Sequence, residues 1–354
     1  MKRITFKKII LFAGLIATAS AHAEDKFTVN GFGYQDYRQS SANSQDKVDR
    51  RGSWSYGAIG FVVSAKASER DTVWAQLEST LTEPTAFTWA FLDHRFTDNL
   101  SVHVGRVKLP LGLYNEFIDN KWLQLGVLQP SIYTPSADMV HDAYTGVGAD
   151  LTSGSLRTQL YVGNVYNNPP EDVNGAIPFI DRRMFGGRIT WDTPYEGLHF
   201  MASGYRTQVE STSSAPPPVI GQGRIGNEDR SILSVDYTSG PLDIKGEYAT
   251  HKVPTLPTST AVTSKALYIQ GGYKIGSWMP YVRYDNFNAD KQNTSSPALN
   301  QRDQTIGVSY KIDENINARL EYHAIHGYGL ALAGGGVGGT TDWKMVAAGI
   351  NFLF

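Results

Sequence analysis

Two stretches in the second half of the chain decide the fold: PLDIKGEYATH at residues 241–251 and INARLEYHA at residues 316–324. In the first, Leu242, Ile244 and Tyr248 alternate with Asp243 and Lys245, and the second stretch repeats this pattern. Successive side chains of a strand point to opposite faces. Each stretch therefore predicts a β-strand with one apolar face and one charged face.

The same period-two alternation recurs in segments of about ten residues along the chain after its N-terminal region. Between residues 24 and 354 we count sixteen such segments. They cover residues 27–37, 54–66, 70–80, 86–96, 99–109, 143–152, 155–164, 182–192, 196–208, 230–239, 241–251, 264–275, 277–288, 301–313, 315–326 and 342–354.

The connections between these segments fall into two length classes that alternate along the chain. Seven are tight, at residues 67–69, 97–98, 153–154, 193–195, 240, 276 and 314. The other eight are mostly long, at residues 38–53, 81–85, 110–142, 165–181, 209–229, 252–263, 289–300 and 327–341. Outer-membrane barrels have short periplasmic turns and long external loops. The sequence thus predicts an all-β fold, a 16-stranded antiparallel transmembrane β-barrel.

The N-terminus indicates export. Residues 1–23 have a basic start, an apolar stretch at 9–19 and a small-residue cleavage site at Ala21-His22-Ala23, which predicts a signal peptide. Residues 24–354 then form a single barrel domain, with 28 Lys and Arg against 34 Asp and Glu. This negative balance disfavours nucleic acid as a partner. The absence of cysteine excludes disulfides and thiolate sites.

Residues in the first third and at the end of the chain carry a resemblance to a known family. The stretch GRVKLPLGLY at 105–114 is similar to the start of the pore loop in phosphate-selective and DcaP-like porins, and the ending GINFLF at 349–354 resembles that of Gram-negative general porins. The resemblance implies a homotrimer, an aqueous channel and insertion directed by the C-terminal aromatic strand. The phosphate-specific members carry a ladder of inward arginines, from which this chain departs.

A barrel of sixteen strands is too wide to be filled by its own side chains, so a constriction is needed. The third outer loop, at about 110–142, has an apolar stretch and a net charge of −3, and we expect it to fold inward against the wall. Acids of this loop would face wall cations and set the ion preference. The predicted constriction and selectivity residues are Arg106, Lys108, Glu116, Asp119, Lys121, Asp138, His141, Asp142, Arg157, Arg188, Arg283 and Arg319.

In the strand at 99–109 the alternation falters, because Arg106 and Lys108 share parity with Val102 and Val104. Either a bulge rotates the two cations into the lumen, or they lie above the bilayer.

The expected function is passive diffusion of small hydrophilic solutes and ions across the bacterial outer membrane, with lipid and lipopolysaccharide around the barrel. A channel selective for small anions such as phosphate or organic acids, an outer-membrane hydrolase and a receptor barrel remain alternatives. The hydrolase is disfavoured because His141-Asp142 and Asp93-His94 are adjacent in sequence, and sequence neighbours in a strand point to opposite faces, so neither pair is a ready catalytic dyad. We expect no catalytic residue, cofactor or metal.

Overall fold

We describe the protein from a computed structural model. The described residues are 26–45, 50–81, 84–165, 179–211, 223–254, 262–331 and 339–354. The predicted signal peptide, residues 1–23, lies outside them. Within these ranges no helix has the length and apolar character to cross a membrane.

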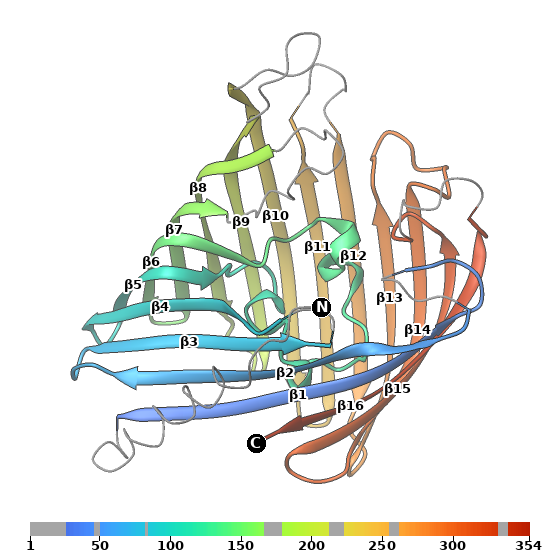
Figure 1. The fold of residues 1–354 in the computed structure, drawn as a ribbon, viewed down its shortest axis with the longest axis horizontal. Coiled ribbons are helices and arrows are strands. Elements are labelled where there is room, and N and C mark those ends of the chain that lie inside the picture. Colours follow the sequence, from blue (N-terminus) through green and yellow to red (C-terminus); the bar gives the residue numbers. More distant parts are fainter. Residues whose placement is uncertain are drawn as a thin grey trace, which may run out of the picture.

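The described chain contains sixteen strands joined into one sheet (Figure 1). The first eight are β1 (Phe27–Ser40), β2 (Ser53–Lys66), β3 (Asp71–Thr80), β4 (Ala86–Thr97), β5 (Leu100–Lys108), β6 (Ala143–Ser153), β7 (Leu156–Val165) and β8 (Phe179–Asp192). The second eight are β9 (Leu198–Ser211), β10 (Gly223–Ser239), β11 (Leu242–Lys252), β12 (Thr263–Tyr273), β13 (Trp278–Asn288), β14 (Asn300–Lys311), β15 (Ile316–Gly327) and β16 (Asp342–Leu353).

The sheet closes on itself, because every strand pairs antiparallel with its sequence neighbours and β1 pairs with β16. The seam runs from Phe32 opposite Leu353 to Ser40 opposite Met345. Beyond it, the N–H of Gly31 donates to the carbonyl of Phe354 at 2.7 Å. Closure removes the free edges that would otherwise leave backbone groups unpaired in lipid. The predicted fold class, a 16-stranded antiparallel barrel, is confirmed.

Fifteen of the sixteen predicted segments agree with the observed strands to within about three residues at each end. The exception is β10, which begins at Gly223 and not at residue 230. The additional residues, GRIGNED, are polar and glycine-rich and do not alternate, so the pattern could not identify them. Their pairing with β9 includes a register shift between Arg224 and Gly226.

The two faces of the barrel differ as the period-two pattern requires. On β14, Ile306 is 65% exposed on the outside, whereas its neighbour Thr305 is 2% exposed. On β15, Leu320 is 52% exposed and Glu321 is 1% exposed. An apolar outer face and a polar inner face are what a barrel in a bilayer needs. The charged residues of these strands therefore point into the barrel.

Tight turns join the strands at one end. Gly154, Gly240 and Gly276 have φ angles of +58°, +55° and +60°, in the left-handed region that favours glycine. Each lies between two consecutive strands, at a turn that the sequence marked as short. These three hairpins thus reverse direction in very few residues without strain.

The long connection between β5 and β6 lies inside the ring of strands in Figure 1. It carries four short 3-10 turns: η1 (Asn115–Phe117), η2 (Lys121–Leu123), η3 (Ser131–Tyr133) and η4 (Pro135–Ala137). Of these, η2 contacts β1 and β16, and η3 contacts β12 and β13. The main apolar cluster joins this connection to the inner wall. Among its buried members are Leu109, Leu111, Tyr114, Ile132, Met139, Ala249, Ala266 and Tyr268.

Candidate functional site

The segment from Leu109 to Asp142, here called the lumen segment, is tied together at its base. The side-chain amide of Asn115 donates to the carbonyls of Leu109 and His141, each at 2.9 Å. Lys108, the last residue of β5, forms an ion pair with Asp119 at 2.7 Å and another with Asp142. These contacts join the start of the segment to its end, so the segment is a closed loop.

The other acidic side chains of the lumen segment also have cationic partners. Glu116 lies 2.5 Å from the guanidinium of Arg188 on β8. Asp138 lies 3.1 Å from the guanidinium of Arg230 on β10. Glu116 and Asp138 therefore bind the segment to the wall.

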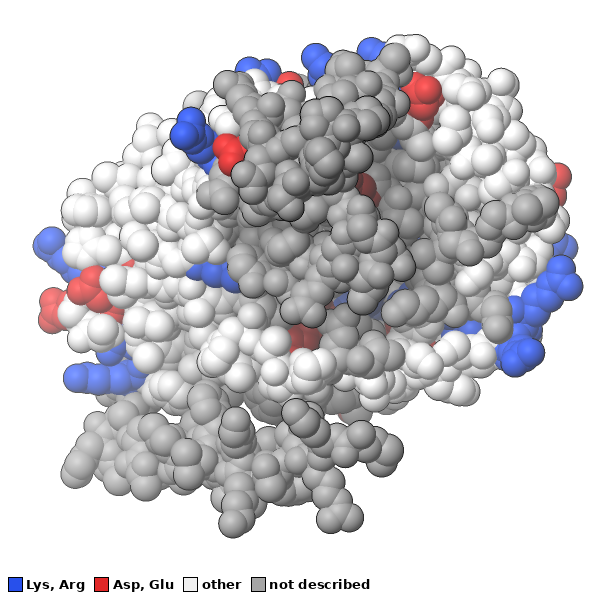
Figure 2. All heavy atoms as spheres, turned by 45° about the horizontal axis from the view of Figure 1, so that its top comes forward, with Lys and Arg blue, Asp and Glu red and all other residues white. Residues whose placement is uncertain are grey.

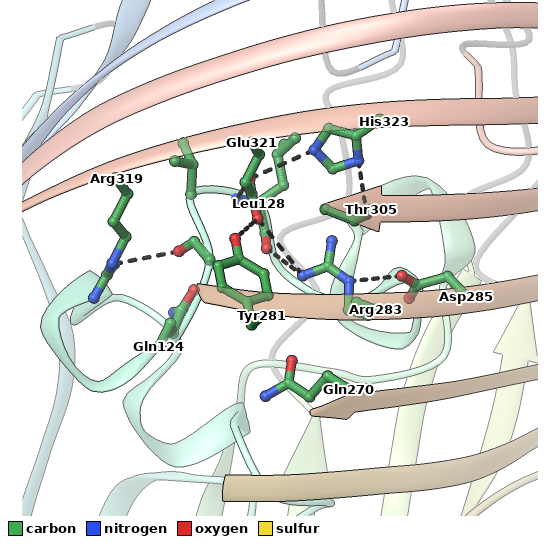
Figure 3. A network of polar contacts seen from close by, with 12 residues as sticks. Gln124, Leu128, Gln270, Tyr281, Arg283, Asp285, Thr305, Arg319, Glu321 and His323 are labelled. Carbon is green, nitrogen blue, oxygen red and sulfur yellow. Dashed lines mark hydrogen bonds and ion pairs between the residues drawn. The ribbon is translucent and has the colours of Figure 1, made fainter. Parts of the chain in front are cut away.

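Two wall arginines bind the backbone of the segment (Figure 3). Arg319 donates to the carbonyl of Lys121 at 2.6 Å and to the carbonyls of Trp122 and Gly126, each at 3.2 Å. Arg283 donates to the carbonyl of Leu128 at 2.9 Å. Both guanidiniums are buried. Charged donors of this kind make stronger hydrogen bonds than neutral ones.

Three buried wall carboxylates accept hydrogen bonds from N–H groups of the same segment. The N–H of Leu128 donates to Glu321 at 2.9 Å, the N–H of Ser131 donates to Asp285 at 2.6 Å, and the N–H of Leu113 donates to Glu247 at 2.8 Å. Inward-facing charges from the opposite side of the barrel thus act as partners for backbone groups that a loop would otherwise present to water.

A buried histidine extends this network on β14 and β15 (Figure 3). Nδ1 of His323 lies 2.8 Å from Asp303, and Nε2 lies 3.5 Å from Glu321. Tyr281 donates its hydroxyl to Glu321 as well. The carboxylate of Glu321 therefore connects the backbone of the lumen segment to a histidine and a tyrosine of the wall.

A cavity of about 900 Å³ lies between the lumen segment and the wall. Its lining is rich in hydroxyl, amide and charged groups from both sides. Charged and titratable lining residues are Arg38, Lys121, Arg283, Asp285, Asp303 and His323, with Tyr34 and Tyr56 as aromatic ones. In the view of Figure 2, Lys, Arg, Asp and Glu side chains are scattered around the rim of the barrel, with both signs represented.

Within the cavity lining, Lys121 has an unusual environment. Its ammonium donates to the carbonyl of Val127 at 3.2 Å and lies 5.7 Å from the ring centre of Tyr34. Among the described residues no carboxylate lies within 4.0 Å of it, whereas Arg283 and Arg38 have Asp285 and Asp36 as partners. Burial lowers the pKa of Lys121 to about 8. The amine therefore carries most of its positive charge at neutral pH and loses it in mild alkali.

Burial also changes the titration of two other groups of the lumen segment. The pKa of His141 is lowered to about 4, first by burial and then by Arg230, so this imidazole is neutral at pH 7. The pKa of the Tyr133 hydroxyl is raised well above its usual value by burial and by Glu247. Tyr133 therefore keeps its proton and donates it to Glu247 at 2.6 Å.

The predicted selectivity residues are distributed unevenly. Ten of them belong to the lumen segment or touch it: Lys108, Glu116, Asp119, Lys121, Asp138, His141, Asp142, Arg188, Arg283 and Arg319. Arg157 lies elsewhere, beside the tight turn after β8, where it is half-exposed and pairs with Asp192 at 2.9 Å. Arg106 lies on β5 opposite Ala90 and Thr145. The role of each of the twelve residues in ion selectivity stays a prediction.

The faltering pattern of β5 does not come from a bulge, because its pairing with β6 runs from Leu100 to Lys108 without a register shift. Gly105, in the middle of the strand, has a φ angle of +144°, in the region that favours glycine. His103 is buried and Val104 is exposed on one side of it, and Lys108 is buried on the other. Lys108 thus reaches the acids of the lumen segment although it shares parity with the exposed Val104.

Several residues of the site were not singled out from the sequence. Arg230 is buried and binds both Asp138 and Glu228, with Glu228 in turn 3.0 Å from His251. Arg38 stacks 3.8 Å from the ring centre of Tyr56. Arg230 shares strand parity with Asp236, so the period-two rule would have identified it as a lumen residue.

The contacts of the histidines bear on the hydrolase alternative. His94 pairs with Asp71 on the adjacent strand at 2.7 Å and not with its sequence neighbour Asp93. His326 pairs with Asp342 at 2.7 Å. Across the described ranges, no cluster of three or more His, Cys, Asp or Glu side chains could hold a metal ion.

Comparisons with known proteins agree with this architecture. Residues 201–333 match the family described as phosphate-selective porin O and P. No curated protein matches the chain.

Solved structures resemble nearly the whole chain at low sequence identity. OmpF of Salmonella typhi, in complex with daunomycin, is 12% identical with a TM-score of 0.63, covering 93% of this chain and 97% of its own. The anion-selective porin from Comamonas acidovorans is also 12% identical with a TM-score of 0.63, covering 93% and 99%. In-vitro folded OmpT of Vibrio cholerae, in its trimer form, is 13% identical with a TM-score of 0.60, covering 93% and 100%. The chain thus has the fold of Gram-negative outer-membrane porins, and its residues 201–333 match the phosphate-selective porins O and P.

Proposed function

We propose that this protein is an outer-membrane porin through which small hydrophilic solutes and ions diffuse down their gradients. The observation that carries the proposal is the cavity of about 900 Å³ between the lumen segment and the wall, to which many polar and charged residues contribute, inside a closed barrel with an apolar outer face. An apolar exterior matches lipid and a polar interior matches water. Barrels of this strand number enclose an aqueous channel.

The lumen segment is the proposed constriction. Its position is supported by hydrogen bonds to inward side chains of β8 to β15, including Arg188, Arg230, Arg283 and Arg319. Charged groups that remain at the cavity surface would set the preference between anions and cations. The proposal assigns no catalytic residue, cofactor or metal to the protein.

Export and assembly complete the proposal. The signal peptide at residues 1–23 would direct the chain across the inner membrane before cleavage, and the barrel at residues 24–354 would insert among outer-membrane lipid and lipopolysaccharide. A homotrimer is supported by the likeness to an outer membrane protein solved in a trimer form.

A channel that prefers small anions is the second candidate. Its support is Lys121, a cavity cation with no described carboxylate within ion-pair distance, together with the family match of residues 201–333. A cation in a water-poor constriction attracts anions more strongly than it would in bulk water.

Solute flux into vesicles tests the proposal. Purified, refolded protein is inserted into lipid vesicles, which are then diluted into isotonic sugars or amino acids of increasing size, and swelling is followed by light scattering. A porin gives swelling rates that fall with solute size and rise linearly with solute concentration. Rates equal to those of protein-free vesicles for every solute would contradict the proposal, and rates that saturate with one anion would favour the selective channel.

A further inference from the structure

Arg319 differs from the other cations of the wall in what it binds. Arg319 is 5% exposed, and its guanidinium donates to the backbone carbonyls of Lys121, Trp122 and Gly126. A fourth bond, to the side chain of Asn351 at 3.2 Å, fixes it to β16. Within the described chain it has no carboxylate at ion-pair distance, unlike Arg188, Arg230 and Arg283. The positive charge of Arg319 therefore interacts mainly with backbone carbonyl groups.

Two of these carbonyls, those of Lys121 and Trp122, belong to a single short turn, and Gly126 follows three residues after that turn. Turn η2, Lys121–Leu123, starts at Asn120, whose side chain accepts from the N–H of Trp122 at 3.1 Å. The carbonyl of Lys121 accepts the N–H of Gln124 at 3.0 Å, and a carbonyl oxygen has a second lone pair that can accept from Arg319. Arginine offers several donors in a rigid plane, so one guanidinium can bind several carbonyls at once, which the single ammonium of lysine does less well.

The same turn presents Lys121 to the cavity. The backbone carbonyl of Lys121 binds Arg319, whereas its side chain folds toward Val127 and Gln124 and lies beside the ring of Tyr34. Both Lys121 and Tyr34 line the cavity, and Arg319 does not. A solute in the cavity would thus meet the ammonium of Lys121 before it meets the guanidinium of Arg319.

We infer that Arg319 is a positioning residue, which holds turn η2 by its carbonyls so that the Lys121 ammonium stays at the cavity wall, and that Lys121 supplies the charge felt by permeating ions. This inference rests on the proposed channel function. It differs from the simpler view in which every inward arginine adds its own charge to the pore.

A charge-conserving substitution separates the two views. In the positioning view Arg319→Lys loses the hydrogen bonds to two of the three carbonyls, the turn shifts, and the anion-to-cation permeability ratio falls by about twofold or more, as in Arg319→Gln. In the additive-charge view Arg319→Lys keeps the ratio of the wild type. The readout is the reversal potential under a salt gradient in a planar bilayer.

A substitution that changes no charge supplies an independent perturbation of the turn. A Cβ on Gly126 would clash with Oε1 of Glu321 and lie 3.0 Å from the carbonyl of Leu128, so Gly126→Ala must displace either the Glu321 carboxylate, which accepts the N–H of Leu128, or the segment itself. We expect it to lower the permeability ratio as Arg319→Lys does. The matched control is Gly271→Ala on β12, where a Cβ meets no atom within 4 Å and the ratio should stay unchanged.

The pH dependence of the permeability ratio provides a further readout, because the titration of Lys121 would change this ratio and a general loss of barrel rigidity would not. Burial lowers the pKa of Lys121 to about 8; among the charges that face it, Arg38 and Arg319 lower the pKa further, and Asp36 and Glu321 raise it. The wild-type ratio should therefore fall with a midpoint near pH 8. This step should be absent in Lys121→Met, and its midpoint should move to higher pH in Arg319→Gln.

The outcomes are distinguishable. A wild-type protein that inserts into the bilayer but conducts no current contradicts the proposed channel function. If the wild type conducts and Arg319→Lys has the same permeability ratio as the wild type, the inference is overturned. A Lys121→Met variant that keeps the wild-type ratio and its pH dependence also overturns the inference. Strand content by circular dichroism confirms that each variant is folded; if Arg319→Lys does not fold, Gly126→Ala decides, because an unchanged ratio there also overturns the inference.

Discussion

The hydroxyl of Tyr133 lies at a point where removal of one atom should release the start of the lumen segment. This hydroxyl donates to Oε2 of Glu247 at 2.6 Å and accepts the N–H of Leu113 at 2.8 Å and the N–H of Tyr114 at 3.1 Å. Tyr133→Phe deletes it with almost no change of shape. Leu113 keeps a second acceptor in Oε1 of Glu247, whereas the buried N–H of Tyr114 loses the hydroxyl.

The expected cost follows from these contacts. A hydrogen bond to a charged group contributes about 1.5–3 kcal/mol, and a buried N–H left unpaired costs about 1–3 kcal/mol. Added together, these two terms indicate that Tyr133→Phe lowers the free energy of unfolding by about 2.5–6 kcal/mol, most of it at the anchor between the lumen segment and β11. A local loss of about 3 kcal/mol corresponds to roughly a hundredfold faster opening at this anchor.

Two measurements check this prediction. Urea unfolding of the protein in lipid vesicles, followed by tryptophan fluorescence, gives the change in free energy of unfolding. Amide hydrogen exchange at Leu113 and Tyr114 gives the local opening. The control is Tyr310→Phe, whose ring lies on the outer face. Unchanged exchange at Tyr114 together with an unfolding free energy within about 0.5 kcal/mol of the wild type would refute the reasoning.

Three further changes test other contacts of the lumen segment. Burial holds the pKa of His141 at about 4, below its unfolded value, so the wild type should lose roughly 2–3 kcal/mol of unfolding free energy as the pH falls from 6.5 to 4. Urea titrations at each pH measure this loss, and His141→Gln should not show it. Leu109 is fully buried in the apolar cluster, so Leu109→Ala should lower the free energy of unfolding by about 2–5 kcal/mol, and a cost below about 1 kcal/mol would show that the cluster is not packed as described. Arg188→Glu should repel Glu116 and increase current noise in single-channel records, with recovery in the double variant Arg188→Glu, Glu116→Arg; noise that persists in the double variant would argue against the pair.

The barrel was predictable because each strand touches two solvents. Lipid on one side and water on the other impose a period of two, which Leu320 and Glu321 show in one step. The tight turns were predictable because glycine at positions such as Gly240 and Gly276 marks an abrupt reversal. Where both signals were missing, as in GRIGNED at the start of β10, the strand end was misplaced by seven residues.

The candidate site was less predictable. The pattern places Arg283, Arg319 and Glu321 in the lumen, but it does not reveal that they bind the backbone of a segment more than 150 residues away. Such pairs depend on the position of the lumen segment, which is determined by contacts between residues far apart in the sequence. Strand parity alone therefore identifies a charged residue of the inner wall, but it does not show whether that residue faces the solute or binds a loop.

The most direct test of the account is the single-channel conductance of the purified, refolded wild-type protein in a planar bilayer. We predict stable current steps, in sets of three for a homotrimer, that grow with salt concentration, because ions pass through the water between the lumen segment and the wall. A correctly folded, inserted protein that carries no current at any salt concentration or voltage would contradict the account.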